Sequence, residues 1–173
     1  MGLMTKVRAR HIAMMERTCT IIGNLVQTIT PEQAVTLRDP RDGDKGWTVL
    51  EVVSHLAEFD GYFYLRAVLM LEQVYPTLPA YDQEALAREH DYIHQDINEV
   101  YARLAESRKR FVDFFNNLSE EQWNRAGVHP EKGHFTLTDA VMNVTSHDLT
   151  HIEQITRIIA HEVARTTSAQ DVV

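Results

Sequence analysis

Residues 145–155, TSHDLTHIEQI, place two histidines four positions apart in a stretch whose apolar residues have helical spacing. His147 and His151 therefore share one face of the expected helix, about 5–6 Å apart at Cβ. Val144 and Ile155 lie on that same face, which would turn toward a protein core. Two imidazoles with this spacing can reach one metal ion. The spacing alone leaves packing and metal binding equally open, because the chain holds 9 histidines.

Helical periodicity also dominates the rest of the chain and predicts an all-α four-helix bundle. We expect the long helices at about residues 5–29, 48–75, 83–117 and 136–165, and no strand. Capped short helices are expected from Thr30 and near Ser119, inside two connections of about twenty residues, which is longer than the turns of a plain antiparallel bundle. The two halves repeat this order of elements, which suggests two helical hairpins. Residues 1–165 form the predicted single domain, and residues 166–173 are expected to be a disordered tail.

The composition argues against several classes of partner. The 173-residue chain has a net charge of −8 and no basic cluster suited to nucleic acid or an anionic membrane. The densest basic run, residues 108–110, is typical of a solvated helix face. No apolar run is long enough to span a membrane, and the start does not have the regions of a signal peptide. A single cysteine, Cys19, fits a reducing compartment, so we expect a cytoplasmic protein.

A third histidine would strengthen the metal hypothesis, and His55 in LEVVSHLAEFD is the natural candidate. Taken alone it would be a histidine at the edge of the core. Taken with the pair at 147 and 151, it can supply a ligand from a facing helix. A second pair with the same spacing, His90 and His94, lies in more polar sequence and is expected at the surface or in a supporting position.

Other chemistries lack their sequence signatures. HExxH is absent, as are GxSxG, the P-loop and GxGxxG. The ExxH string at residues 131–134 falls in a loop containing proline and glycine, so it does not predict a di-iron bundle. His11 lies on the core face of the first helix without a partner in sequence, and His129 and His134 could overhang the mouth of a pocket.

The segments GWTVLEVVSHLAEFDGYFYLRA (46–67) and HFTLTDAVMNVTSHDLTHIEQI (134–155) together resemble the DinB-like family of four-helix metalloproteins, which includes the YfiT-type thiol transferases. The likeness covers nearly the whole chain and includes the run from His147 to Gln154. It implies an up-down-down-up bundle, frequent homodimers, and one divalent metal held by His55, His147 and His151. Family members often have a histidine or an aromatic residue where this chain has Thr150.

Three neutral histidines leave a divalent metal with an open position, which is the pattern of catalytic rather than structural zinc sites. Zinc or nickel suits such a site, and iron, cobalt and copper also fit. The leading hypothesis is a transferase in which a low-molecular-weight thiol attacks a small electrophilic substrate. A metal-dependent hydrolase that activates water is the alternative. A non-enzymatic dimeric bundle that binds a metal or a ligand is the competing class.

Four further residues are candidates for the site. Asp148 and Glu58 could accept a hydrogen bond from a ligand imidazole or act as a base, although solvated carboxylates are as common on helices. Arg66, with Tyr62 one turn before it, could bind the carboxylate of a substrate, and a salt bridge to a neighbouring helix is the plainer reading. Residues 61–75, GYFYLRAVLMLEQVY, are apolar nearly all round, so we expect this helix at the interface of a homodimer.

Overall fold

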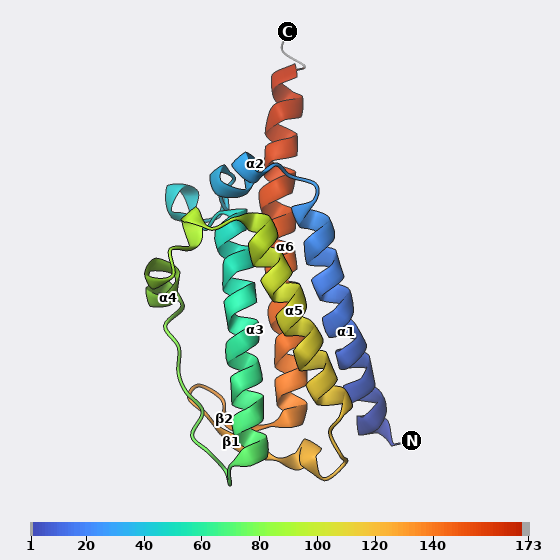
Figure 1. The fold of residues 1–173 in the computed structure, drawn as a ribbon. Coiled ribbons are helices and arrows are strands. Elements are labelled where there is room, and N and C mark those ends of the chain that lie inside the picture. Colours follow the sequence, from blue (N-terminus) through green and yellow to red (C-terminus); the bar gives the residue numbers. More distant parts are fainter. Residues whose placement is uncertain (1, 171–173) are drawn as a thin grey trace.

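The computed structural model describes residues 2–170 and confirms the four-helix bundle. Its long helices are α1 (Leu3–Val26), α3 (Val49–Glu72), α5 (Ile97–Asn116) and α6 (Leu137–Gln170). Figure 1 shows α1 running up from the N-terminus, α3 and α5 both running down, and α6 running up. The chain therefore has the expected up-down-down-up arrangement. No described helix combines the length and the hydropathy of a membrane-spanning segment.

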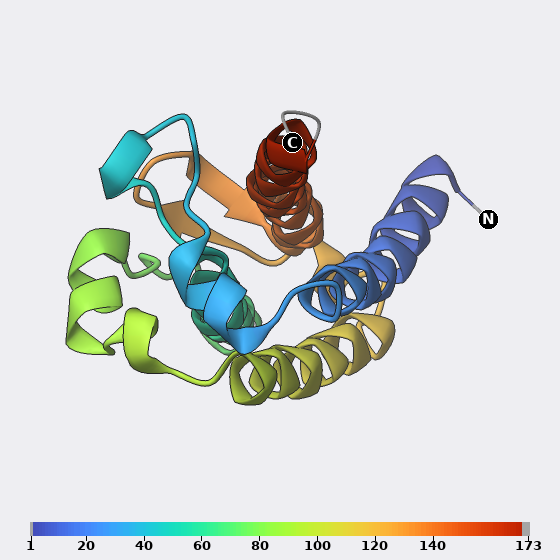
Figure 2. The ribbon, with the colours of Figure 1, turned by 90° about the horizontal axis from the view of Figure 1, so that it is seen from above.

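The long helices do not pair as consecutive hairpins, which corrects the expectation drawn from the two similar halves. α1 packs mainly against α5 and α6, and α3 packs mainly against the same two helices. Seen from above, α1 and α3 lie at opposite corners of the bundle (Figure 2). The connection between them contains α2 (Pro31–Thr36), which lies across one end of the bundle. This long connection lets the chain reach the diagonal position.

The predicted capping boxes set the starts of two helices. The Thr30 hydroxyl accepts the Gln33 amide N–H at 3.1 Å, while the Gln33 side chain accepts the Thr30 N–H at 2.9 Å. Thr48 and Glu51 make the same reciprocal pair at the start of α3. Each box satisfies two backbone donors that a helix start would otherwise leave without partners.

The prediction of one continuous helix over residues 83–117 is wrong, because the structure divides this stretch into separate helices. A short α4 (Gln83–Glu89) is followed by a turn of 3₁₀ helix, η2 (Tyr92–His94), before α5 begins. Asp91 adopts the left-handed region at φ 47°, which ends the helical path. Asp96 then accepts the N–H groups of Asn98 and Glu99 and starts α5 afresh.

A two-stranded hairpin, which the sequence did not predict, follows the 3₁₀ turn η3 (Gln122–Asn124). β1 (Ala126–His129) pairs antiparallel with β2 (Gly133–Thr136). The segment that follows α3 (residues 73–82, here called the strap) is attached to this hairpin. Backbone hydrogen bonds join Val128 to Pro76 and to Leu78. At the other end of the chain, α6 continues past Arg165 to Gln170, so residues 166–170 of the expected tail are helical, and residues 171–173 lie outside the described part.

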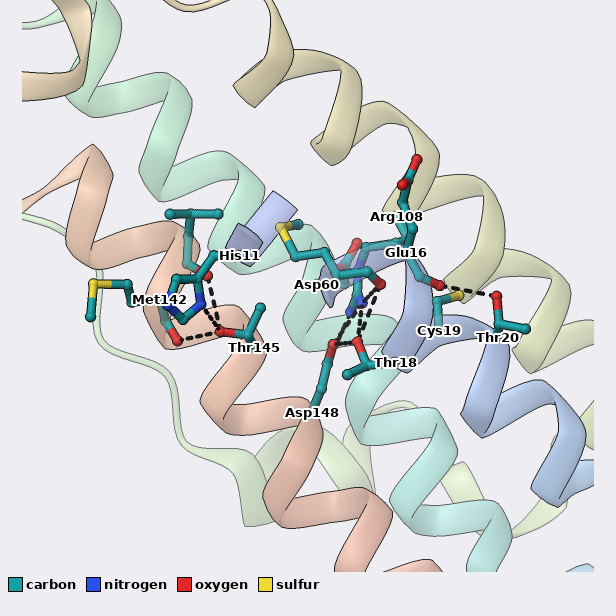
Figure 3. Close-up of polar contacts among 12 residues, drawn as sticks. His11, Glu16, Thr18, Cys19, Thr20, Asp60, Arg108, Met142, Thr145 and Asp148 are labelled. Atoms are coloured by element: carbon teal, nitrogen blue, oxygen red, sulfur yellow. Dashed lines mark hydrogen bonds and ion pairs between the residues drawn. The ribbon is translucent and has the colours of Figure 1, made fainter. Parts of the chain in front are cut away.

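A buried ionic layer crosses the bundle where its two apolar clusters meet, and Arg108 is at its centre (Figure 3). Arg108 was expected on a solvated face, but only 3% of it is exposed. From α5 its guanidinium donates to Asp60 on α3 at 2.8 Å and to both oxygens of Asp148 on α6 at 2.6 and 3.0 Å. It also donates to the Met15 carbonyl oxygen at 2.8 Å, and the Thr18 hydroxyl of α1 donates to Asp148. These contacts join all four long helices.

Replacing Arg108 by alanine should lower the free energy of unfolding by about 3–5 kcal/mol, because two buried carboxylates would lose their counter-charge. Urea denaturation at pH 7 measures this change. The matched control is Arg110→Ala, an exposed arginine of the same helix, which should change the free energy by less than about 0.5 kcal/mol. A loss below about 1 kcal/mol for Arg108→Ala would contradict the role given to this layer.

A second ion pair, between half-buried Arg157 and a buried carboxylate, attaches the loop before α3 to α6. Arg157 donates to Asp39 at 3.1 Å (Nε) and 2.6 Å (Nη2), and Asp39 is 1% exposed. These bonds hold the pKa of Asp39 down at about 2, from an ordinary value of 3.8, against the opposing effect of burial.

Because the folded pKa of Asp39 is depressed, its contribution to stability should be fully present above pH 4 or so and lost as the pH falls through about 2. Asp39→Asn should therefore cost about 2 kcal/mol at pH 7 and progressively less toward pH 2. Urea denaturation of both proteins across this range measures the difference. Asp42→Asn, an exposed carboxylate of the same loop, is the control. A difference for Asp39→Asn that does not change with pH would contradict this account.

Candidate metal centre

Three histidines from two helices meet inside the bundle. His55 comes from α3, while His147 and His151 lie one turn apart on α6, which packs against α3. One nitrogen from each imidazole lies within 4.8 Å of the other two. The Nε2 atoms of His55 and His147 are 2.9 Å apart. Among residues 2–170 these three form the group of side chains that could hold a metal.

The three side chains suit a divalent metal ion. Two nitrogens that each bind one tetrahedral ion at 2.0–2.1 Å are about 3.3 Å apart, so His55 and His147 need to move by only a few tenths of an ångström. Burial lowers the pKa of all three imidazoles, that of His55 to about 3, and His151 adds to this effect on the other two. They are therefore neutral at pH 7, which is the form that binds metals.

A chain of polar contacts orients His151. Its Nδ1 lies 2.8 Å from Oε1 of Gln154. The Gln154 side chain also lies beside the carboxylate of Asp39, where it helps Arg157 to lower the pKa of that group. The contacting atom of Gln154 is its amide oxygen, which can only accept a hydrogen bond. This requires the proton of His151 on Nδ1 and leaves Nε2 free for a metal.

An open cavity of about 520 Å³ adjoins the histidines, with His55 and His147 in its wall. Phe59, Phe63 and Tyr81 supply aromatic surface to this cavity. The Phe59 ring centroid is 4.2 Å from that of His55, and the Phe63 centroid is 5.1 Å from that of His147. Exposed residues of α4 and of the turn between the strands form the rim. A small molecule could therefore approach the histidines from solvent, as a catalytic site requires.

Arg66 and Tyr62 were the two predicted substrate contacts. The structure places Arg66 in the wall of this cavity, whereas Tyr62 does not line the cavity and packs against Tyr81. Arg66 lines the wall, where its guanidinium lies 5.1 Å from the ring centroid of Tyr81. Tyr62 stacks on Tyr81 with centroids 3.8 Å apart, and its hydroxyl donates to Glu58 at 2.9 Å. Arg66 makes no salt bridge among the described residues, contrary to the plainer reading of the sequence.

The structure does not bring Glu58 or Asp148 to the histidines. Glu58 lies beside a separate cavity of about 670 Å³. There it binds His90, with Oε1 2.6 Å from Nδ1, and it accepts the hydroxyl of Tyr92. Asp148 follows His147 directly, but its side chain leaves the helix in another direction, toward Arg108 and Thr18. Neither carboxylate is therefore positioned to support a ligand imidazole.

Four of the other histidines have partners outside this group of three. His11 bonds the Thr145 hydroxyl at 2.7 Å, exposed His94 bonds Asp91 at 2.7 Å, and exposed His134 contacts Tyr75. His129 lines the cavity beside Arg66, as its loop position suggested it could.

Sequence reasoning missed the supporting roles of Asp39, Tyr81 and Gln154. Only Gln154 carried a signal, since it follows His151 by one helical turn. Asp39 and Tyr81 lie in loops far from the histidines in sequence, so spacing could not connect them to the site.

Replacing Gln154 by alanine should weaken metal binding about 10- to 100-fold, because His151 would lose the acceptor that fixes its tautomer and orientation. Titration of Zn²⁺ against a chromophoric chelator measures this affinity. Gln73→Ala, an exposed glutamine at the end of α3, is the control and should bind Zn²⁺ like the parent. An unchanged affinity in a folded Gln154→Ala protein would show that this hydrogen bond does not support the ligand.

Known proteins similar to this chain include four-helix bundles described as metal-dependent. The chain is 31% identical over 150 residues to YfiT of Bacillus subtilis (strain 168), which spans 86% of this chain and 82% of that protein. The structure of B. subtilis YfiT, described as a probable metal-dependent hydrolase with an unusual four-helix bundle topology, superposes with a TM-score of 0.83 over 94% of this chain and 90% of that one.

A more distant likeness extends to the mycothiol-dependent maleylpyruvate isomerase, with a TM-score of 0.72 at 8% identity over 90% of this chain and 63% of that one. At that identity the likeness concerns the fold alone. The family model of the DinB superfamily matches residues 10–155, and the chain belongs to that superfamily.

Proposed function

We propose that this protein is a metal-dependent enzyme that acts on a small electrophilic molecule, with one divalent ion held by His55, His147 and His151. The observation that carries the proposal is the convergence of three neutral imidazoles within 4.8 Å, two of which, His55 and His147, lie in the wall of an open cavity. Three protein ligands leave at least one position for an exchangeable group, as catalytic zinc sites do. Zinc and nickel are the first candidates, and iron, cobalt and copper suit imidazole as well.

A divalent ion at this position supplies Lewis acidity, which makes a thiol or a water molecule a nucleophile near neutral pH. The chain's own residues supply the surroundings. Phe59, Phe63 and Tyr81 present apolar surface to the reacting molecule and exclude bulk water, while Arg66 and His129 offer polar contacts farther along the wall. We assign no role at the metal to Asp148 or Glu58, since their carboxylates are engaged elsewhere.

Transfer from a low-molecular-weight thiol and hydrolysis use the same site with different nucleophiles. The description of YfiT as a probable metal-dependent hydrolase supports the water-activating form. The likeness to thiol transferases and the exchangeable metal position support the thiol form, in which a low-molecular-weight thiol is the second substrate. The two forms differ in one measurable way, since only the transferase requires added thiol for turnover.

We also propose a cytoplasmic homodimer, on narrower grounds. Cys19 is buried and unpaired, which fits a reducing compartment. Within residues 61–75, Leu65, Val74 and Tyr75 remain exposed by 44%, 91% and 51%, which leaves apolar surface for a second subunit. The other apolar residues of this stretch are buried or partly buried by the chain itself, so the interface would be smaller than the sequence suggested.

The protein purified without a histidine tag should contain close to one divalent metal per chain by elemental analysis. The His147→Ala/His151→Ala double variant should contain none while keeping its helical circular dichroism. The His94→Ala/His134→Ala variant, which removes two exposed histidines outside the site, is the control and should keep the metal.

Absence of metal in the parent, even after incubation with Zn²⁺ or Ni²⁺, would overturn the proposal. With the metal in place, electrophiles such as aryl halides and epoxides plus a thiol test the transferase, and activated esters and amides without thiol test the hydrolase. A metal-loaded protein that turns over neither class would instead be a non-enzymatic binding bundle.

A further inference from the structure

Arg66 is a buried cation that lacks an acidic partner among the described residues. Only 7% of the residue is exposed. Its Nε and Nη2 donate to the Pro79 carbonyl oxygen at 3.0 and 2.6 Å, and Nη1 lies 3.0 Å from Nε2 of His129. All these acceptors are neutral groups. Arginine keeps its charge in proteins, and a buried charge without a counter-charge is costly.

Arg108, which is also buried, shows which kind of partner Arg66 lacks. Arg108 has two carboxylates within 3.0 Å of its nitrogens, and the three contacts use both sides of its guanidinium. Arg66 is nearly as buried, yet it faces an open cavity instead of a carboxylate. The acidic residues of that cavity are Asp82, Glu84 and Glu131, all exposed at its rim.

The rest of the cavity fits a ligand with one negative end. Lys132, whose Nζ bonds the Asn143 side chain at 2.7 Å, adds a second positive charge at the rim. Between Arg66 and the histidines the wall is aromatic, formed by Phe59, Phe63 and Tyr81. A planar guanidinium can take a carboxylate through two parallel hydrogen bonds, which gives both energy and direction.

The spacing along α3 sets the length of such a ligand. His55 and Arg66 are three helical turns apart, or about 16 Å along the axis. Helix side chains lean toward the N-terminus, so the long Arg66 side chain shortens the gap to the order of 10 Å. A ligand that reaches both ends must therefore carry its charge several bonds away from its reacting atom.

We infer that this cavity takes a small carboxylate whose charged end binds Arg66, whose apolar body lies along Phe59, Phe63 and Tyr81, and whose other end reaches the three histidines. The inference rests on the proposed function and narrows it to anionic substrates. Either the electrophile or the thiol can carry the carboxylate.

The test compares two probes of equal shape, 4-phenylbutyrate and its uncharged amide, on the zinc-loaded protein by isothermal titration calorimetry. The acid should bind at least ten-fold more tightly than the amide. Arg66→Gln should abolish this difference by weakening the acid alone, and Arg66→Lys should retain part of it. Arg103→Gln, in the wall of the other cavity, is the matched control and should bind both probes like the parent.

Equal binding of acid and amide to the parent, or a preference that survives in Arg66→Gln, would overturn the inference. The second result would mean that the carboxylate binds the metal instead. The acid–amide comparison on the parent needs no variant, so it stands even if Arg66→Gln does not fold.

A measurement of metal content distinguishes failure of the proposed function from failure of this inference. If the chain holds no metal, the proposed function fails, and the acid–amide comparison on the metal-free His147→Ala/His151→Ala variant still tests Arg66. Competition by 8-mercaptooctanoate, whose thiol and carboxylate are about 10 Å apart when extended, and by its amide then identifies the source of the charge. Stronger competition by the acid places the carboxylate on the thiol, and equal competition places it on the electrophile.

Discussion

The Arg108 guanidinium is the contact on which the rest of the bundle depends. From α5 it reaches carboxylates on α3 and α6 and a carbonyl oxygen on α1, in the layer between two apolar clusters (Figure 3). Apolar packing alone tolerates rotation and sliding of a helix, whereas these directional bonds do not. A buried ionic layer of this kind contributes little net stability against an apolar alternative, but here it fixes how α6 is turned. Asp148 points to Arg108, and because neighbouring helix residues differ by 100°, His147 then points to α3.

How far the site follows from the sequence depends on how far apart its parts lie along the chain. His147 and His151 share a helix turn, so spacing alone places them together, and the family likeness supplies His55. The capping boxes at Thr30 and Thr48 are likewise local patterns, and they were predicted. The burial of Arg108 was not predicted. Its partners Asp60 and Asp148 lie 48 and 40 residues away, and nothing in the local sequence distinguishes Arg108 from its exposed neighbours. The four-residue strands are too short to show alternation, and the break at Asp91 depends on backbone geometry.

The site divides its tasks between regular and irregular parts of the chain. The three ligands come from α3 and α6, whose positions are fixed by the packed core. The outer wall comes from the strap after α3, the start of α4 and the turn of the hairpin. Rigid helices suit metal ligands, which need fixed distances, while loops tolerate change and commonly determine which molecule is accepted. Relatives that share the histidines can therefore differ in substrate through these loops alone.

The packing of the loop before α3 against the metal centre has a thermodynamic consequence. The loop that precedes α3 carries Trp47, whose ring lies 5.2 Å from that of His55, and Asp39, which lies beside the Gln154 side chain that bonds His151. Any equilibrium in which this loop opens must then be linked to metal occupancy, and the linkage is reciprocal. An ion in the site would hold the loop closed by the same factor by which the closed loop strengthens the binding of the ion. The opening equilibrium of this loop and the affinity of the site for its metal would thus report the same coupling free energy.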